Sequence, residues 1–532
     1  MESADDAAAS GVRGMGRPLL LLLVIHLLVW TVVPAVVNQN LPLDVVEAIA
    51  WGAEWEWGYD KHPPLSGWMA AGAGWVGRAV ADATGLGTGD WALYLLSQVC
   101  VVAAMLGVYL LGRETLGAGG GGRRAVLAVL LMQGVTYHHF TSPEFNVNVA
   151  QLPFWAFAFY LYWLALRDDR LWQWGGIGLC VGLAVLSKYL GGLIVFPLLL
   201  FPLVSREHRW VLRKPGMYVS AGVCLLVVLP HLWWASQNQW MTLTYGLDRA
   251  GADEPWSLLD HVVHPIDFVL AQALAALATV PIVWAWGIRR RGKGDATQAV
   301  AGADEVAGVP HASRFLLVMA ATPMGVFCGL SLVAGFELRS MWGTPLLLLL
   351  GAVLADRFRF TRVGDAKRLV LPPLIVCVVL AGVYAGTTLT SVAVRDKGKR
   401  TNFDGVAFSQ ALESAWRERT DRPLTIVAGR VWESCNPAWY LPQRPTAYLY
   451  ADPLRAPWVD DAAMRERGGL IVWTKARRAD ADPATHVPCP YEGLAERFPA
   501  HAVLEDVVVP WPGDPEAAGG GMRFGVVYVP PR

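Results

Sequence analysis

Residues 18–37 read PLLLLLVIHLLVWTVVPAVV, a stretch without a single charged side chain. A hydrocarbon core about 30 Å thick needs about 20 such residues per helix. We therefore predict that this stretch crosses a membrane as a helix. It is not typical of a cleavable signal, because it is long, lacks a small-residue cleavage site and is followed by further apolar runs.

The rest of the chain repeats this pattern. Hydrophobic residues make up 54% of the 532 residues and charged residues only 17%, whereas about a quarter of a typical soluble domain is charged. Lys and Arg together number 44, as do Asp and Glu, so the net charge of zero gives no support for nucleic-acid binding. The sequence predicts a polytopic α-helical membrane protein with about eleven spans, at 18–37, 91–112, 125–141, 147–166, 171–187, 189–204, 216–235, 266–288, 315–335, 343–356 and 369–391.

The loops between these spans alternate in positive charge. Lys and Arg are dense before residue 18 and in the loops at 113–124, 167–170, 205–214, 288–314 and 357–368. Up to residue 391 the other side holds only Lys61, Arg78, Lys188, Arg249 and Arg339. Cytoplasmic loops carry the excess of Lys and Arg. We therefore expect a multi-pass protein of the cytoplasmic (inner) membrane, with a cytoplasmic N-terminus and an extracytoplasmic, or periplasmic, C-terminal region.

The chain divides into a membrane domain at 1–391, which includes a long external loop at 38–90, and a C-terminal domain at 392–532. In the C-terminal domain charge and Pro increase, and β-rich stretches occur at 424–428, 470–474, 503–509 and 523–529 after a predicted helix at 404–419. This order predicts a small α/β or α+β domain. This domain contains two cysteines, Cys435 and Cys489. In an oxidising compartment they could form a disulfide or remain free thiols, and the sequence favours neither outcome.

The external loop at 38–90 is rich in Trp. Stretches 44–57 and 66–80 could each form a helix at the membrane interface, where Trp is favoured. Interfacial anchoring does not account for Asp44, Glu47 or the tripeptide 60–62, Asp-Lys-His. A loop held by local ion pairing is the plain alternative for these charged residues.

Other spans also end in polar residues on this side. Ionisable groups so near hydrocarbon usually mark a site or a pathway, although each could instead be a snorkelling anchor or a satisfied pair. A lone His is more often structural than catalytic. The residues concerned are Glu144, Asn146, Asn148, Lys188, Tyr189, His231, Arg249, His261, His264 and Arg339.

The first loop carries a specific resemblance. LDVVEAIAWGAEWEWGYDKHPPLSGW (43–68) resembles the first external loop of polyprenyl-phosphate-sugar-dependent glycosyltransferases of the GT-C fold, the family-39-like group with aminoarabinose transferase of lipid A and protein O-mannosyltransferases. FNVNVAQLPFW (145–155), LSKYLGGLIVFP (186–197) and LPHLWWASQNQW (229–240) extend the likeness over about the first 250 residues. Beyond them the likeness lies mainly in topology.

The resemblance implies a donor sugar on polyprenyl phosphate and a reaction at the outer membrane surface. Asp44 matches the catalytic loop-one acid, and Lys61 and Lys188 match lysines that contact phosphate. The resemblance also implies a divalent metal, held by Asp60 with one of the histidines His231, His261 and His264; no other cofactor is expected. We expect donor-phosphate binding by Tyr59, Lys61, Lys188, Tyr189 and Arg339, and substrate binding by Glu47, His62, Glu144, Asn146, Asn148 and Arg249.

One position departs from the family pattern. Relatives often carry Asp where this chain has Asn148, so Asn148 is expected to bind substrate at most. The remaining assignments are chemically consistent, because fixed cations stabilise the phosphate that leaves. Asp44 could then accept the proton of the acceptor hydroxyl during an inverting displacement, or orient an acceptor that is itself a phosphate.

The predicted function is transfer of a monosaccharide to a lipid or glycan acceptor of the cell envelope, with lipopolysaccharide or lipid A favoured over protein. A secondary transporter or flippase is the first alternative. It predicts ionisable groups at mid-span and inverted repeats, neither of which is evident. A non-catalytic envelope assembly protein, docking through residues 392–532, is the second alternative.

Overall fold

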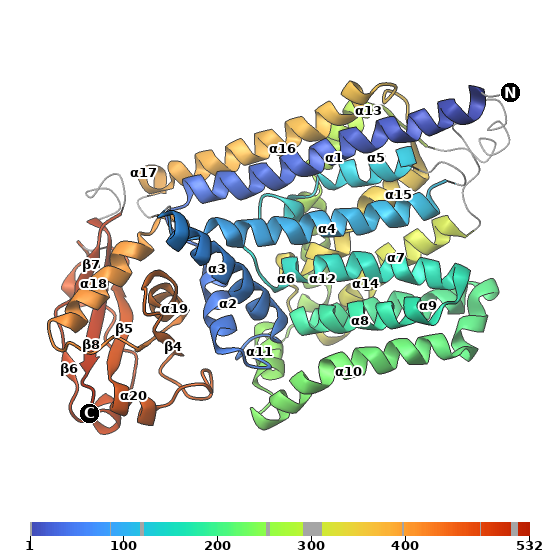
Figure 1. Cartoon of the computed structure of the whole chain (residues 1–532). Coiled ribbons are helices and arrows are strands. Elements are labelled where there is room, and N and C mark those ends of the chain that lie inside the picture. The colour runs from blue at the N-terminus through green and yellow to red at the C-terminus, as the bar shows by residue number, and fades with distance from the viewer. Residues whose placement is uncertain are drawn as a thin grey trace.

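The structure is a computed structural model that describes residues 3–85, 87–117, 122–251, 256–290, 311–395, 398–478, 480–511 and 520–532. Long helices form one bundle, and a mixed β-sheet lies at one end of it (Figure 1). The chain is therefore built from a membrane part and a C-terminal sheet domain.

Six helical segments of the described residues are long and apolar enough to cross a membrane. Figure 1 shows several of them side by side. A seventh span is a pair of helices, α12 (Asp260–Ala275) and α13 (Thr279–Trp286), with a bend of 53° between them. The six are the apolar part of α1 (Ser3–Val37), α4 (Trp91–Thr115), α6 (Val147–Ala150) with α7 (Leu152–Asp168), α10 (Pro215–Gln237), α14 (Ala312–Ala334) and α16 (Ala366–Leu389).

The other four predicted spans are helical but shorter. They contain α5 (Gly122–Met132), α8 (Leu171–Ser187), α9 (Val195–Val204) after the 3₁₀ turn η2 (Tyr189–Ile194), and α15 (Leu350–Arg357) after η5 (Ser340–Leu347). The last eight of the eleven residues of α5, from Ala125 to Met132, are buried against protein. A helix that is apolar all round is either a membrane span or a buried core helix, which is why the hydrophobic pattern alone does not fix the number of spans.

The external loop folds into the two predicted helices, α2 (Leu43–Glu54) and α3 (Leu65–Thr84). They pack closely where Gly52 meets Gly67, since a Cβ on Gly52 would lie 1.9 Å from the Gly67 carbonyl oxygen. Later in the chain η1 (Thr136–His138), η3 (Arg206–Arg213) and α11 (Met241–Arg249) connect the spans, and β1 (Ile288–Arg290) pairs with β2 (Phe358–Phe360).

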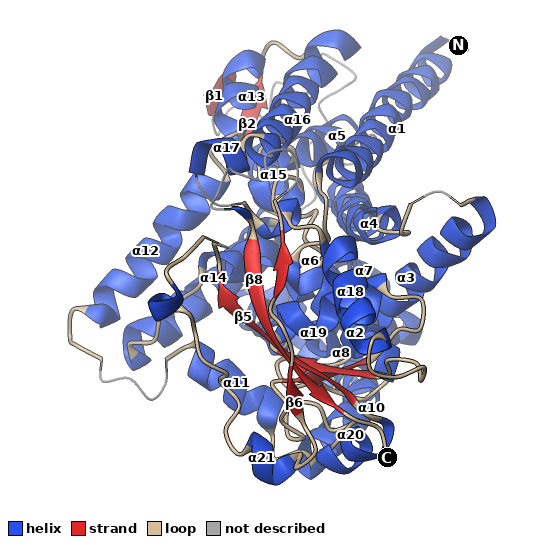
Figure 2. Ribbon diagram, turned by 90° about the vertical axis from the view of Figure 1, so that its left-hand side faces the viewer, coloured by secondary structure: helices blue, strands red, loops and turns tan. Residues whose placement is uncertain are grey.

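The C-terminal domain is a mixed sheet of order β4-β3-β5-β8-β6, with β7 beside β8. Strand β3 is parallel to β4 and β5, and β8 is antiparallel to β5, β6 and β7. The sheet lies among its helices in Figure 2. Its strands and helices are α17 (Ser391–Arg395), η6 (Arg400–Asn402), α18 (Gly405–Arg417), β3 (Ile426–Gly429), α19 (Val431–Tyr440), β4 (Thr446–Leu449), α20 (Asp461–Arg467), β5 (Gly469–Ala476), η7 (Pro483–Thr485), α21 (Leu494–Arg497), β6 (Ala502–Val503), β7 (Val507–Val509) and β8 (Met522–Val529).

The disulfide considered from the sequence is not formed. Cys435 and Cys489 are both free thiols. Cys435 is fully buried on α19, whereas Cys489 lies half-buried in the irregular segment after β5. The buried thiol serves as a small apolar packing group.

The C-terminal domain rests on the external helices of the membrane part. Asp90, before α4, accepts hydrogen bonds from Trp439 Nε1 at 2.8 Å and from the Tyr440 hydroxyl at 3.0 Å. The Tyr440 hydroxyl also accepts a bond from the Leu41 amide at 3.0 Å, and the Arg78 guanidinium lies 4.0 Å from the Trp439 ring centroid. This contact holds α19 directly over the start of α2.

Candidate active site

Asp44 lies in the first turn of α2 and is held by a segment a hundred residues later. Its carboxylate Oδ2 accepts a bond from Asn146 Nδ2 at 3.4 Å, and its amide donates to Glu144 Oε1 at 3.3 Å. Asn146 can reach because it caps α6, where its Oδ1 accepts bonds from the amides of Asn148 and Val149. Burial raises the pKa of Asp44 above its ordinary value, against the effects of Lys61 and of the Asn146 bond.

A buried acid–lysine pair begins three residues further along α2, at Glu47. Lys61 Nζ donates to Glu47 Oε1 at 2.5 Å, and Glu47 is only 5% exposed. Burial raises the pKa of Glu47 to about 8, because it outweighs the attraction of Lys61. For Lys61, burial would lower the pKa, but Glu47 and Asp60 together raise it. Lys61 therefore stays cationic.

Lys188 approaches Asp44 from the junction between α8 and η2. The residue leaves the helix in an extended conformation, and its Nζ donates to Asn148 Oδ1 at 2.8 Å while lying 5.1 Å from the Trp342 ring centroid. Burial lowers the pKa of Lys188 to about 7, and Asp44 opposes that shift. A lysine with such a pKa is charged or neutral at physiological pH depending on a neighbouring anion.

These residues form one group, which we name the Asp44 cluster. Its chain of contacts runs from Lys188 through Asn148 and Asn146 to Asp44, and the charge of Lys61 acts on Asp44 as well. The cluster consists of Asp44, Glu47, Asp60, Lys61, Glu144, Asn146, Asn148 and Lys188.

His62 and Arg249 border the cluster. The His62 ring meets Trp51 and Tyr245 edge-on, at centroid distances of 6.1 and 5.7 Å. Burial, followed by the charges of Lys188 and Lys61, lowers the pKa of His62, so this ring is neutral. Arg249 is exposed on α11, and its charge acts on Lys188.

Three predicted phosphate ligands have other described contacts. Tyr59 is fully buried and stacks on Trp51 at 5.3 Å, with no hydrogen bond to its hydroxyl. The Tyr189 hydroxyl pairs with His231 Nε2 at 2.7 Å and donates to Thr242 Oγ1 at 3.1 Å. Arg339 pairs with Glu337 at 2.8 Å. Tyr59 and Tyr189 thus hold neighbouring segments. Among the described contacts, Arg339 is linked to the cluster through Trp342, whose amide donates to the Arg339 carbonyl.

The three candidate histidine ligands also lie among other partners. His231 has both ring nitrogens engaged, Nδ1 with the Trp57 carbonyl and Nε2 with the Tyr189 hydroxyl, both at 2.7 Å. His261 Nδ1 faces the carbonyl of Leu332 in the last turn of α14, and His264 Nδ1 faces the carbonyl of Gly335 just after that helix. Within the described residues no group of three or more His, Cys, Asp or Glu is placed to hold a metal ion. The donor set that a metal at Asp60 requires is therefore not assembled there.

Two arginines of the C-terminal domain also lie at the cluster, although no sequence motif marks them. Arg455 Nη1 lies 3.9 Å from Asp60 Oδ2, and the charge of Arg400 acts on Asp44 and Glu144. Burial, followed by the charge of Asp44, raises the pKa of Glu144 to about 7, and the charge of Arg400 opposes this shift. Both arginines follow the last span by many residues, and no spacing in the sequence relates them to the first loop.

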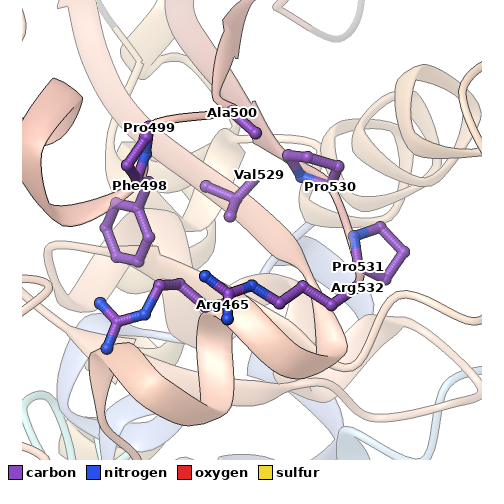
Figure 3. Close-up of a pocket in the computed structure, with 8 residues that line it drawn as sticks. All are labelled: Arg465, Phe498, Pro499, Ala500, Val529, Pro530, Pro531 and Arg532. Carbon is purple, nitrogen blue, oxygen red and sulfur yellow. The ribbon is translucent and has the colours of Figure 1, made fainter.

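A surface pocket of the C-terminal domain lies apart from the cluster. Figure 3 shows Arg465 and Arg532 beside Phe498 and Val529, with Pro499, Ala500, Pro530 and Pro531 completing the lining. It contains none of the residues that the sequence singled out. The chemistry argued below therefore concerns the Asp44 cluster.

Comparisons with known proteins bear on this geometry. A family described as dolichyl-phosphate-mannose-protein mannosyltransferase matches residues 61–234. RgtA of Rhizobium johnstonii, a lipopolysaccharide core galacturonosyltransferase, is 23% identical over 482 residues, which cover 87% of this chain and 88% of RgtA. RgtD of the same organism, a lipid A galacturonosyltransferase, is 27% identical over 285 residues, or 52% of this chain and 55% of RgtD.

Solved structures show the fold. Crystal structures of ArnT from Cupriavidus metallidurans, bound to undecaprenyl phosphate and in the apo state, superpose with TM-scores of 0.60 and 0.57. Each covers 96% of this chain and 98% of ArnT at 13% identity. The likeness to ArnT is one of fold, since few residues are shared.

Proposed function

We propose that this chain, a membrane glycosyltransferase with the GT-C fold, moves a monosaccharide from a polyprenyl-phosphate donor to lipopolysaccharide or lipid A. The activities of RgtA and RgtD suggest a galacturonosyl residue as the first sugar to test. The observation that carries the proposal is the convergence of one carboxylate and two lysines, Asp44, Lys61 and Lys188, from separate parts of the chain.

The reaction takes place at the extracytoplasmic face of the inner membrane in this proposal. The loops rich in Lys and Arg define the cytoplasmic side, and the Asp44 cluster belongs to the opposite side. The C-terminal domain that covers the cluster is then extracytoplasmic too. A lipid-linked donor and a lipid-linked acceptor can both reach such a site from the outer leaflet.

Lys188 and Lys61 stabilise the leaving group. As the bond between the anomeric carbon and the phosphate oxygen breaks, its electron pair stays on that oxygen, so negative charge grows there. Preorganised cations aimed at such charge stabilise the transition state more than the ground state. Lys188 is oriented by Asn148 and Trp342, and we assign Arg249 and Arg339 supporting roles along the same phosphate.

Asp44 acts on the acceptor. The acceptor hydroxyl oxygen forms the new bond to the anomeric carbon from the face opposite the phosphate, and its proton passes to Asp44. The configuration at the anomeric carbon is therefore inverted. A buried carboxylate with a raised pKa is a better proton acceptor than one in water. Asn146 and Glu144 fix its orientation, so both are positioning residues.

Reconstitution of the purified protein tests the proposal. Vesicles would contain lipid A or lipopolysaccharide together with labelled polyprenyl-phosphate galacturonic acid or a neutral hexose donor. We expect label on the acceptor lipid from the uronosyl donor. Label that crosses the vesicle membrane while staying on its polyprenyl carrier would favour a flippase. If neither donor gives labelled acceptor lipid or transported label, the proposed function is contradicted.

A further inference from the structure

Asp60 is a buried carboxylate with no side-chain hydrogen-bond donor in the described residues. It is 5% exposed, and apart from the adjacent backbone amides of residues 60 and 61 no donor faces its oxygens there. An isolated buried carboxylate is costly unless a cation compensates it. The neighbouring residue Lys61 is bound to Glu47, so Asp60 requires a further positive partner.

That partner comes from the C-terminal domain. Arg455 Nη1 lies 3.9 Å from Asp60 Oδ2, and the guanidinium is fixed by the Tyr450 ring at 4.5 Å and by Asp452 at 3.8 Å. Trp458, from the same turn, meets Tyr59 edge-on at 6.1 Å. The turn after β4 thus covers the Tyr59–Lys61 stretch with aromatic and cationic groups together.

The backbone of that turn is strained. Tyr450 and Ala451 have φ angles of +57° and +50°, which side chains with a Cβ adopt rarely. Consecutive strained residues persist where the surrounding structure holds them, often at functional sites. The turn also follows a parallel strand, and ligand sites of open α/β sheets lie at the carboxyl ends of such strands.

We propose that Arg455 is the positioning cation of Asp60, in the place where the family resemblance implies a divalent metal. The geometry favours the guanidinium, because the candidate histidines face other partners and no cluster of metal-binding side chains surrounds Asp60 in the described residues. The proposal deepens the function above and rests on it for its kinetic consequences.

The consequence concerns Lys61. With Arg455 present, Asp60 is compensated by the guanidinium and attracts Lys61 less strongly. The charge of Lys61 is then available to the donor phosphate. Without Arg455, Lys61 is the cation that the described contacts leave to compensate both Glu47 and Asp60. Donor binding should weaken more than turnover. The C-terminal domain is thereby part of the donor site.

A double-mutant cycle tests the pairing. We expect R455Q to raise the KM for the donor about 10-fold with a smaller change in kcat, as contacting charged groups couple, and R455K to restore much of the loss. In a D60N background R455Q should change KM little. The matched control is R417Q, which removes an exposed arginine paired with Glu413 on α18 and should leave KM unchanged.

The opposite pattern overturns the proposal. If R455K is as impaired as R455Q, or R455Q costs as much in D60N as in the wild type, Arg455 acts only by holding the domains together. Melting temperatures of the same variants reveal a general loss of docking, which would raise KM and lower kcat together.

Metal analysis of the purified protein tests the assignment of Arg455 without a transfer assay. We expect mass spectrometry of purified wild type and D60N to show no divalent metal that depends on Asp60. One equivalent of metal in the wild type, lost in D60N, would refute the assignment of Arg455. Absence of sugar transfer by the wild type would instead contradict the proposed function and leave the metal and melting results standing.

Discussion

Replacing Lys188 by Gln removes the cation that we place beside the leaving phosphate, while keeping a side chain that can still bond Asn148. Lys188 is buried, donates to Asn148 at 2.8 Å and lies over Trp342. Loss of one preorganised group that stabilises developing charge costs about 10²–10³-fold in kcat. We expect K188Q to fall in that range, with the protein still folded.

The pH dependence makes this prediction specific. Lys188 must be protonated to stabilise the phosphate, and burial lowers its pKa to about 7. In the wild type kcat/KM should therefore fall above pH 7, reaching about a tenth of its plateau at pH 8, because a pKa of 7 leaves that fraction charged. K188R keeps its charge at all these pH values, so its activity, although lower, should not fall on the alkaline side.

Steady-state transfer assays from pH 5 to 9, with donor below its KM, provide the measurement. On the acidic side Asp44 must be ionised, and its raised pKa means that activity is lost as pH falls through a value above that of a free aspartate. The wild-type profile should thus be a narrow bell. A K188Q variant that retains the wild-type alkaline limb would refute the role given to Lys188.

Three further variants test the structural support of the site. Asn146→Ala removes both a helix cap, which costs about 1 kcal/mol, and the bond to Asp44; we expect a lower melting temperature and a lower kcat, and an unchanged kcat would contradict its positioning role. Gly52→Ala forces a methyl group against the Gly67 carbonyl, and overpacking of this kind costs about 1–3 kcal/mol; thermal unfolding that matches the wild type would show that α2 and α3 can separate freely. Tyr440→Phe deletes two interdomain hydrogen bonds worth about 1 kcal/mol each, so calorimetry should show a less stable protein with nearly normal donor KM, whereas an unaltered melting temperature would argue against this docking contact.

The sequence predicted most of the architecture because strong periodic patterns carry it. The long apolar runs became helices, and the external stretches at 44–57 and 66–80 became α2 and α3. Three of the four β-rich stretches became β3, β5 and β8, the stretch at 503–509 divided into the short strands β6 and β7, and β4 was not predicted. The resemblance of the first loop to GT-C glycosyltransferases is confirmed by the fold of ArnT and by the matches to RgtA and RgtD. The number of spans was harder, since buried helices such as α5 are as apolar as spanning ones.

The grouping of the candidate residues was predictable where chemistry and motif coincide, while their roles stay predictions. Asp44, Lys61 and Lys188 lie in quoted motifs, and the structure brings them within reach of one another. Tyr59 lies in the same motif but stacks in the core, because adjacent residues of an irregular loop point in different directions. Arg400 and Arg455 could not be found from sequence, since their place depends on how the C-terminal domain docks.

The central claim is that Asp44 takes the acceptor proton at the site where Lys188 and Lys61 hold the donor. Single-turnover transfer by Asp44→Asn, with donor binding measured on the same sample, tests it most directly. The account predicts donor affinity close to that of the wild type and a rate of transfer lower by about 10²–10⁴-fold. Transfer at a near-normal rate by this variant would contradict the account.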